Sequence, residues 1–254
     1  MAKVIAIANQ KGGVGKTTSA VNLAASLGAR GKRVLLIDAD PQGNTTSGYG
    51  VEKRGLAHTT YTVLLGQSSA AEAVVETQFA NVSILPSGID LAAAELELSE
   101  MDKRYARLRI ALAPIKDGYD YILIDCPPSL GLITINSLCA ADTLLVPIQC
   151  EYYALEGLSQ LMASVRQIKR LYNERLELEG VLLTMFDNRL NLTRQVVEEV
   201  KKFFPGKVFA TAIPRAVRLS EAPGFGMPVL YYDKSSKGAE AYLSVADELI
   251  KHNK

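Results

Sequence analysis

The chain has no tryptophan among its 254 residues, three cysteines, and no long apolar run. Its hydrophobic stretches fall well short of the roughly 20 residues that a membrane-spanning helix needs. The odd number of cysteines shows no C-x-x-C or zinc-ligand spacing, so neither a disulfide framework nor a zinc site is predicted. The apolar run at 4–8 is too short for a signal peptide. We therefore expect a cytoplasmic protein without a membrane partner.

An excess of charge of one sign is also lacking. Lys and Arg number 28 and Asp and Glu number 27, which leaves a net charge of +1. This balance excludes a protein that coats nucleic acid through bulk charge, so any such binding must use a local patch. The hydrophobic fraction of 48% is ordinary for a folded domain. Because no low-complexity linker or repeat interrupts the chain, we predict a single domain over 1–254.

Short β-rich runs alternate with longer helical patterns along the whole chain. Strands are predicted at 3–8, 33–37, 82–85, 121–124, 143–148, 180–185, 208–209 and 229–230. Helices are predicted at 17–30, 133–140, 154–172, 192–204 and 238–251, with a capping box at 69–72 and a further helix after Gly88. Strands such as 34–37 are apolar on both faces, as in a parallel sheet that helices cover on both sides. The fold class predicted is α/β, a doubly wound and mostly parallel twisted sheet flanked by helices.

A glycine-rich loop with two lysines lies directly between the first strand and the first helix. It consists of Lys11, Gly12, Gly13, Val14, Gly15, Lys16, Thr17 and Thr18. The glycines let successive N–H groups point at one anion, and the helix N-terminus adds its dipole. Lys16 would neutralise phosphate charge, and the Thr17 hydroxyl would ligate Mg²⁺. The usual G-x-x-x-x-G-K-[ST] pattern has glycine where this chain has Gln10, and here Lys11 follows instead.

Aspartates stand at the ends of two predicted strands. Asp125 ends one of them, at the carboxyl edge where ligands of open α/β folds collect, and could hold a water ligand of Mg²⁺. Asp40 follows another strand and would face the γ-phosphate, while Asp38 would support the loop or the metal shell. Strand-end aspartates often only cap turns. Their position beside a phosphate loop favours the functional interpretation.

The loop resembles the deviant Walker A motif of the ParA/MinD class of P-loop ATPases. Residues 38–44 resemble the switch I segment of that class, and 125–129 resemble its Walker B and switch II segment. With the segments 149–157 and 215–223, the whole chain resembles ParA proteins in their short chromosomal form. Those proteins have no N-terminal helix-turn-helix domain, and none is expected here.

The resemblance implies an ATPase with ATP and Mg²⁺ as cofactors, slow alone and stimulated by a partner. Lys11, Lys16 and Asp40 would be the catalytic residues, with Asp40 positioning the attacking water. Lys11 would reach across an ATP-dependent homodimer to the phosphates of the other subunit; the alternative is an ordinary exposed lysine. Pro214 would lie beside the adenine. Ala216 departs from the asparagine usual in close relatives, which puts base selectivity in doubt.

A basic patch in the C-terminal half is the candidate DNA-binding surface. Residues 187–221 contain seven basic and four acidic residues, a pattern that by itself suits a solvated face. The resemblance instead implies that Arg189 and Arg218 bind double-stranded DNA nonspecifically. It also implies a ParB-like partner protein and association with the nucleoid. The function expected is an ATP-dependent dimeric switch that segregates chromosome or plasmid DNA.

Other members of the same class are alternatives. A MinD-like membrane-associated ATPase would need a C-terminal amphipathic helix, but the apolar stripe at 242, 245, 246, 249 and 250 is expected to be core. A nitrogenase-type iron–sulfur protein would use cysteines, and Cys126 lacks the flanking glycines of that type. A dethiobiotin-synthetase-like enzyme would need a substrate pocket. A tyrosine kinase of this class would end in tyrosines, whereas Tyr231 and Tyr232 precede the last helix.

Overall fold

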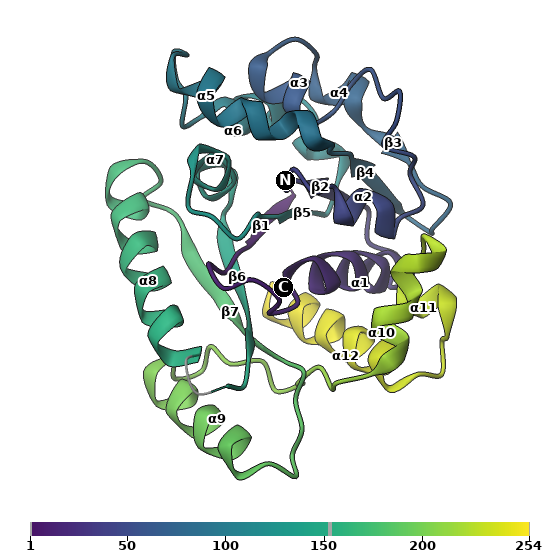
Figure 1. Cartoon of the computed structure of the whole chain (residues 1–254), viewed down its shortest axis with the longest axis vertical. Coiled ribbons are helices and arrows are strands. Elements are labelled where there is room, and N and C mark those ends of the chain that lie inside the picture. Colours follow the sequence, from purple (N-terminus) through teal and green to yellow (C-terminus); the bar gives the residue numbers. More distant parts are fainter. Residues whose placement is uncertain (1, 152–153, 254) are drawn as a thin grey trace.

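A seven-stranded sheet runs through the computed structural model, which describes residues 2–151 and 154–253 (Figure 1). The strands lie in the order β3-β4-β2-β5-β1-β6-β7. Their bounds are β1 Lys3–Ile7, β2 Val34–Asp38, β3 Val75–Glu76, β4 Val82–Leu85, β5 Tyr121–Asp125, β6 Thr143–Gln149 and β7 Glu177–Thr184. All neighbouring strands pair in parallel except β3, which pairs antiparallel with β4. The predicted mostly parallel α/β sheet is confirmed.

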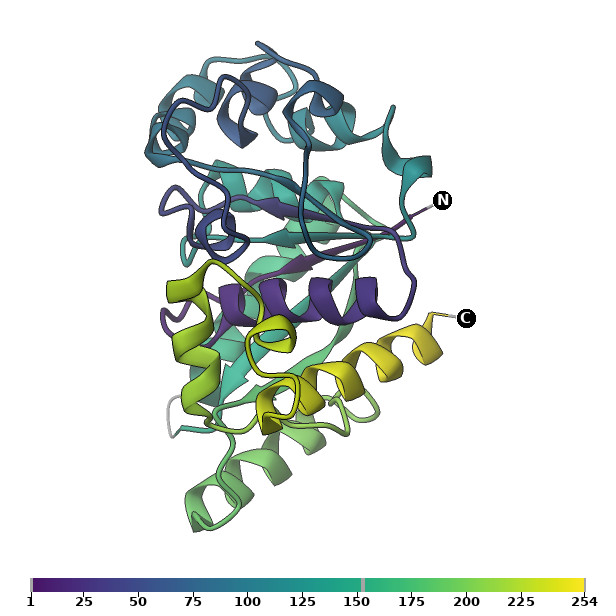
Figure 2. The ribbon, with the colours of Figure 1, turned by 90° about the vertical axis from the view of Figure 1, so that its right-hand side faces the viewer.

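Helices cover both faces of this sheet. On one face α1 and α12 lie side by side, with α10 and α11 beside them (Figures 1 and 2). The bounds on this face are α1 Lys16–Ala29, α2 Asn44–Gly48, α10 Val217–Glu221, α11 Val229–Tyr232 and α12 Lys237–His252. The opposite face carries α3 Thr60–Leu65, α4 Ala70–Ala73, α5 Ala94–Ser99, α6 Arg107–Leu112, α7 Leu132–Ala140 and α8 Ala154–Leu171, and α9 Asn191–Phe203 contacts α8. Single 3₁₀ turns occur at Ile89–Ala93, Lys116–Gly118 and Ala222–Phe225.

The central strands explain why their sequences are apolar throughout. Every residue of β2 and β5 is buried. Side chains alternate between the two faces of a strand, so Leu35 and Ile37 belong to one core and Val34 and Leu36 to the other. Each face of the sheet therefore has its own hydrophobic core, and the doubly wound arrangement follows from the sequence pattern.

Two of the short predicted strands are wrong. Residues 229–230 form the start of α11, where the Val229 N–H donates to the Asn22 side chain at 2.7 Å instead of to a strand. Residues 208–209 make only an isolated bridge, between Val208 and Val181. Two apolar residues in a row carry no periodicity, so they cannot distinguish a strand from a buried turn of helix. The equally short β3 was not predicted.

The longer predicted helices are confirmed, with ends displaced by a residue. The capping box is present, since the Ser69 N–H donates to the Glu72 carboxylate at 2.8 Å, and a 3₁₀ turn follows Gly88. On α12, Tyr242, Val245, Ala246 and Leu249 are buried against the core that contains α1, and Ile250 packs on its edge.

The C-terminal stripe is therefore core, as expected. None of the described helices combines the length and the apolar character needed to cross a bilayer.

Candidate functional site

The glycine-rich loop leaves β1 at the carboxyl edge of the sheet and enters α1. Gly13 and Gly15 adopt positive φ angles of 74° and 84°, which side chains rarely tolerate, and Gly15 is the N-cap of α1. A Cβ atom placed on Gly12 or Gly13 would meet no atom within 4 Å, so the backbone borders open space. The loop is anchored by Thr184, whose hydroxyl donates to the Val14 carbonyl at 2.8 Å. Its exposed N–H groups and the helix N-terminus form a cradle suited to an anion.

A cavity of about 310 Å³ lies directly over this cradle. The phosphate-loop residues Gly12, Gly13, Gly15, Lys16, Thr17 and Thr18 line it together with Asp40, Gln42, Asn44, Pro128 and Met185. Lys16 is buried, and its ammonium donates to the Lys11 carbonyl at 3.2 Å. Burial lowers the pKa of Lys16, and the nearby Asp125, Cys126 and Asp40 oppose that shift. The fold thus brings one desolvated cation and one carboxylate, Asp40, to the same small space.

The two aspartates at the end of β2, Asp38 and Asp40, differ in what they contact. Asp38 is fully buried, and its carboxylate accepts hydrogen bonds from the Thr46 N–H at 2.8 Å and the Thr46 hydroxyl at 2.7 Å. Burial raises the pKa of Asp38 to about 6. Asp38 therefore ties the start of α2 to β2. Asp40 accepts from the Gln42 N–H at 2.9 Å, which caps the turn, and still lines the cavity.

Asp125 carries an unused hydrogen-bonding atom. Its carboxylate is wholly buried at the end of β5; one oxygen accepts from the Thr45 hydroxyl at 2.7 Å, and the other, Oδ1, has no hydrogen-bond partner among the described residues. Burial, with Asp38 nearby, raises the pKa of Asp125 to about 7. The Thr17 side chain is close enough to Asp125 to oppose this rise in its pKa. A buried carboxylate oxygen without a partner, beside a hydroxyl, fits a metal-bound water. In the described part of the chain, this site included, no group of three or more His, Cys, Asp or Glu side chains could hold a metal ion.

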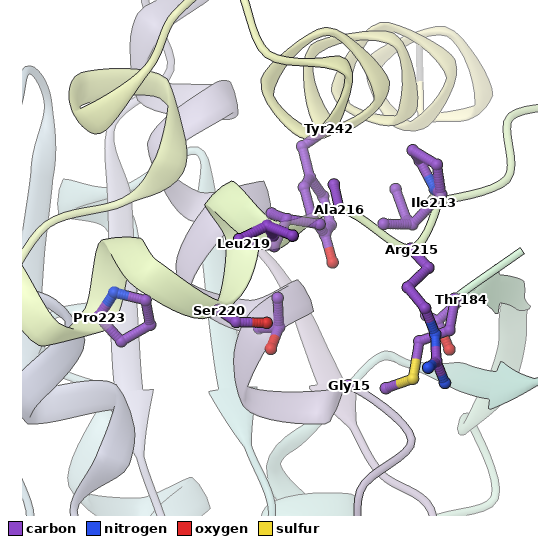
Figure 3. Close-up of a pocket in the computed structure, with 13 residues that line it drawn as sticks. Gly15, Thr184, Ile213, Arg215, Ala216, Leu219, Ser220, Pro223 and Tyr242 are labelled. Atoms are coloured by element: carbon purple, nitrogen blue, oxygen red, sulfur yellow. The ribbon is translucent and has the colours of Figure 1, made fainter.

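A second, larger cavity of about 470 Å³ adjoins the first and shares Gly15, Thr18 and Met185 with it. Figure 3 shows its walls, with Tyr242 of α12 and Leu219 of α10 on one side and Arg215 and Thr184 on the other. Pro214 and Ala216 both line it. The two cavities form one cleft, with an anion cradle at one end and a mainly apolar chamber at the other. That division matches the phosphates and base of a nucleotide.

Several lining residues were not predicted from the sequence. Met185, at the junction of the two cavities, has a φ of 49°, which is uncommon for a residue with a side chain and typical of functional sites. Tyr242 is buried in the larger cavity, where its hydroxyl lies 3.1 Å from the Ser19 hydroxyl. The end of the apolar strand at 180–185 could have indicated Thr184 and Met185. No sequence signal places Tyr242 there, because it comes from the last helix.

Lys11 lies apart from Lys16. Its ammonium forms an ion pair with Glu151 of the same chain at 2.6 Å, and its side chain is 39% exposed. The segment 149–157, which contributed to the family resemblance, includes Tyr152 and Tyr153, and these lie outside the described residues. Lys11 is therefore accessible at the carboxyl edge, but it is held by a carboxylate of its own chain.

The two candidate DNA-binding arginines are also paired with acids. Arg189, on the loop before α9, makes a two-pronged contact with Asp187 at 2.9 and 2.6 Å while its side chain stays 84% exposed. Arg218, on α10, bonds to Glu221 at 2.8 Å and lies 3.2 Å from Asp233. Exposed pairs of this kind are worth at most about 1 kcal/mol. Either guanidinium can therefore exchange its partner for a phosphate at small cost.

The cysteines give no support to an iron–sulfur site. Cys126, Cys139 and Cys150 are all buried and unlinked. Burial raises the pKa of the Cys126 thiol to about 12, so it remains a protonated, apolar core group.

Comparison with known proteins identifies the family. The family model described as an AAA domain matches residues 2–178. The chain is 55% identical to the sporulation initiation inhibitor protein Soj of Bacillus subtilis, over 98% of each chain. It is 52% identical to the chromosome partitioning protein ParA of Myxococcus xanthus, over 99% of this chain and 89% of that protein.

A solved structure is similar along the whole length. The crystal structure of cobyrinic acid a,c-diamide synthase from Mycobacterium smegmatis, with bound ATP analogue and magnesium, superposes with a TM-score of 0.90 at 38% identity. The match covers 100% of this chain and 96% of that one. Because both sequence relatives exceed half identity over nearly all of the chain, this protein belongs to the ParA/Soj family of P-loop proteins.

Proposed function

We propose that this protein is an ATP-dependent dimeric switch that binds DNA nonspecifically and segregates chromosome or plasmid DNA with a ParB-like partner. The observation that carries the proposal is the two-chamber cleft, in which the phosphate loop and Asp40 line one cavity. The buried carboxylate of Asp125, with its unpaired oxygen, lies near Lys16 of that loop. The family membership, and the ATP analogue and magnesium bound in the similar M. smegmatis structure, support ATP and Mg²⁺ as the cofactors.

In this proposal the residues of the cleft divide the nucleotide between them. The loop N–H groups and Lys16 hold the phosphates, and the chamber lined by Pro214 and Tyr242 holds the base. Thr17 and Asp125 would hold Mg²⁺, Thr17 through its hydroxyl and Asp125 through a water on its free oxygen. A magnesium ion held there would supply neutralisation of the phosphate charge for transfer to water. Asp40 orients the attacking water, since its carboxylate is the one acid among the described residues that lines the phosphate cavity.

Lys11 supplies the link between nucleotide and dimer. It lies on the open edge of the loop, where a second copy of the chain could approach with its own loop. Each copy extends its Lys11 side chain to the nucleotide site of the other copy, where it neutralises phosphate charge. The same surface is then used on both copies, so the interface is isologous. Hydrolysis removes the charge that holds this lysine, so the dimer separates. Turnover is slow unless the partner protein stabilises the hydrolysing arrangement.

DNA binding follows from the dimer. Arg189 and Arg218 lie on the exposed surface outside the cleft, so nucleotide does not cover them. Two arginines per chain give weak phosphate contacts, and a dimer doubles their number and raises the affinity steeply. In this way DNA binding reports the nucleotide state, and the protein associates with the nucleoid only as the ATP dimer.

The decisive experiment separates dimerisation from DNA binding. Arg189→Ala and Arg218→Ala should weaken binding to nonspecific duplex DNA while the variants still dimerise with Mg²⁺ and a non-hydrolysable ATP analogue. Asp40→Ala should trap dimers on DNA with ordinary ATP, and Lys16→Ala should abolish both responses. Light scattering reports mass, and fluorescence anisotropy reports DNA binding. Loss of dimerisation in the arginine variants, or a lone subunit in the wild type with the analogue, would refute the proposal.

A further inference from the structure

A groove lies at the end of the molecule opposite to the nucleotide cleft. It consists of two adjoining cavities of about 250 and 280 Å³, which share Arg109 and Cys139 as common walls. The walls come from α6, the end of α7 and the end of α8, which lie on one side of the sheet (Figure 1). These segments lead into β5, β6 and β7, so the groove is at the amino edge of the sheet. The phosphate loop is at the carboxyl edge, after β1.

One end of the groove is apolar. The rings of Tyr105 and Tyr172 contact each other with their centroids 4.3 Å apart and tilted by 30°, and Leu171 beside them is 53% exposed. Both tyrosines are half-buried and line the cavity, and the Arg104 guanidinium lies over the Tyr105 ring, 5.0 Å from its centroid. A partly exposed aromatic pair of this kind offers stacking and apolar contact to one large side chain.

The walls are fixed in place by two buried or half-buried amides. The Asn136 side chain on α7 donates to the Arg104 carbonyl at 2.6 Å and accepts from the Leu108 N–H at 3.2 Å. The Asn173 side chain donates to the Leu138 and Ala141 carbonyls at 2.9 and 2.8 Å. These bonds tie the segments that carry Tyr105 and Tyr172 to α7. The groove is therefore preformed, and a ligand would not have to order it.

The other end and the rim are basic. The ionisable side chains that line the two cavities, apart from tyrosine and cysteine, are Lys103, Arg109, Lys116, Arg175 and Asp142. Asp142 is already bound, by Lys116 at 3.3 Å and by the Val4 N–H at 2.8 Å. Among the residues that the structure describes, no carboxylate pairs with Lys103, Arg109 or Arg175. The groove therefore presents three cations without counter-charges in the described chain beside an apolar pocket.

We infer that this groove binds an acidic peptide segment of a partner protein, with one aromatic or aliphatic side chain seated against Tyr105 and Tyr172. Charge complementarity selects acidic flanking residues. A basic segment would be repelled. A DNA backbone would satisfy the cations and leave the tyrosine pocket empty.

The groove is independent of the proposed nucleotide switch. A dimer that forms through Lys11 uses the carboxyl edge, which leaves the groove open on both copies. Binding at the groove therefore goes beyond the proposed function, and it can be measured whether or not the protein dimerises with ATP.

Peptide display on the full-length protein tests the inference. A random peptide library is selected on the wild-type chain and counter-selected on the Lys103→Glu/Arg109→Glu variant. Acidic peptides with a central aromatic or aliphatic residue are expected, and Arg109→Glu should weaken their binding by about tenfold or more. Arg109→Gln, a milder change, should weaken it less. Lys32→Glu, which changes a lysine outside the groove, should leave it unchanged.

The absence of tryptophan from the protein supplies a second readout. A selected peptide that contains one tryptophan is the sole source of indole emission, which should shift to shorter wavelength as the ring is buried. Tyr172→Ser should reduce that shift while circular dichroism stays unchanged. Enrichment of basic or neutral peptides, equal binding to the charge-reversed variant, or no enrichment would overturn the inference. So would a loss of DNA binding in Arg109→Glu with unchanged peptide binding, because the face would then serve nucleic acid.

Discussion

The ammonium of Lys11 lies 2.6 Å from the carboxylate of Glu151 in the same chain. A lysine that is to reach a second subunit must first leave this partner. The pair is half-exposed, with 39% of the lysine side chain and 47% of the glutamate side chain accessible, so its net worth is about 1 kcal/mol or less. The contact is therefore a weak restraint on Lys11 that a pair of nucleotides could overcome.

Removal of the restraint should favour the dimer. In Glu151→Gln the charge that holds Lys11 is gone, so the dimer with a non-hydrolysable ATP analogue should form at a protein concentration lower by a few-fold, the equivalent of about 1 kcal/mol. Lys11→Ala should bind the analogue and remain a single subunit. Sedimentation velocity measures both. Glu174→Gln, which changes an exposed glutamate in the turn between α8 and β7, is the control and should behave as the wild type. A weaker dimer in Glu151→Gln would mean that Glu151 serves the interface itself.

Asp187 should restrain DNA binding through Arg189. The arginine holds the pKa of Asp187 at about 2, so the pair is fully charged near neutral pH. Asp187→Asn should free Arg189 for a phosphate, which raises the DNA affinity of the ATP dimer a few-fold and steepens its salt dependence. Fluorescence anisotropy over a series of salt concentrations checks this. Asp247→Asn breaks a similar two-pronged pair with Arg30 elsewhere and should change neither quantity. An unchanged affinity in Asp187→Asn would remove Arg189 from the DNA surface.

The three cysteines should be unreactive in the folded protein. All are buried, and burial raises the pKa of Cys126 to about 12 and that of Cys139 and Cys150 to about 11. A thiol-specific reagent at pH 8 should therefore titrate almost no thiol in the native state and all three in denaturant. Rapid reaction of one native thiol would place that cysteine in an accessible site.

Nucleotide-free protein should lose stability as the pH rises. The pKa of Asp38 is raised to about 6 and that of Asp125 to about 7, above the ordinary value of 3.8. The folded state thus holds these protons more tightly than the unfolded state, and the stability they contribute is complete below pH 4 and lost as the pH passes 6 to 7. Thermal melts should give a Tm lower by several degrees at pH 8 than at pH 5.

Two variants isolate the cause of that pH dependence. Asp125→Asn removes one of the two carboxyl groups whose pKa is raised, and should reduce the fall in Tm between pH 5 and pH 8. Asp117→Asn changes an exposed aspartate and should leave the pH dependence of the Tm unchanged. A Tm that does not fall between pH 5 and pH 8 in the wild type would show that the two carboxyl groups are already satisfied in the free protein.

The long elements of the fold could be predicted because their patterns are long. Strand 121–124 is apolar on both faces, which only a covered parallel strand requires, and β5 indeed contributes to both cores. The phosphate loop was equally clear, since three glycines and a lysine between a strand and a helix have one well-known physical use. The strand predicted at 229–230 was wrong, because two residues are too few to show the alternation of a strand.

Local sequence alone therefore determined the phosphate loop, the aspartates at the strand ends and the layered α/β architecture. These features depend on the order of residues along short segments, and parallel strands bring their carboxyl ends to one edge whatever else the chain does. Only the tertiary structure decided that Tyr242 lines the larger cavity, that Glu151 holds Lys11, and that Tyr105 meets Tyr172 beside a cluster of cations. Each of these contacts joins residues far apart in the sequence, and their meeting depends on how α6, α8 and α12 pack on the sheet.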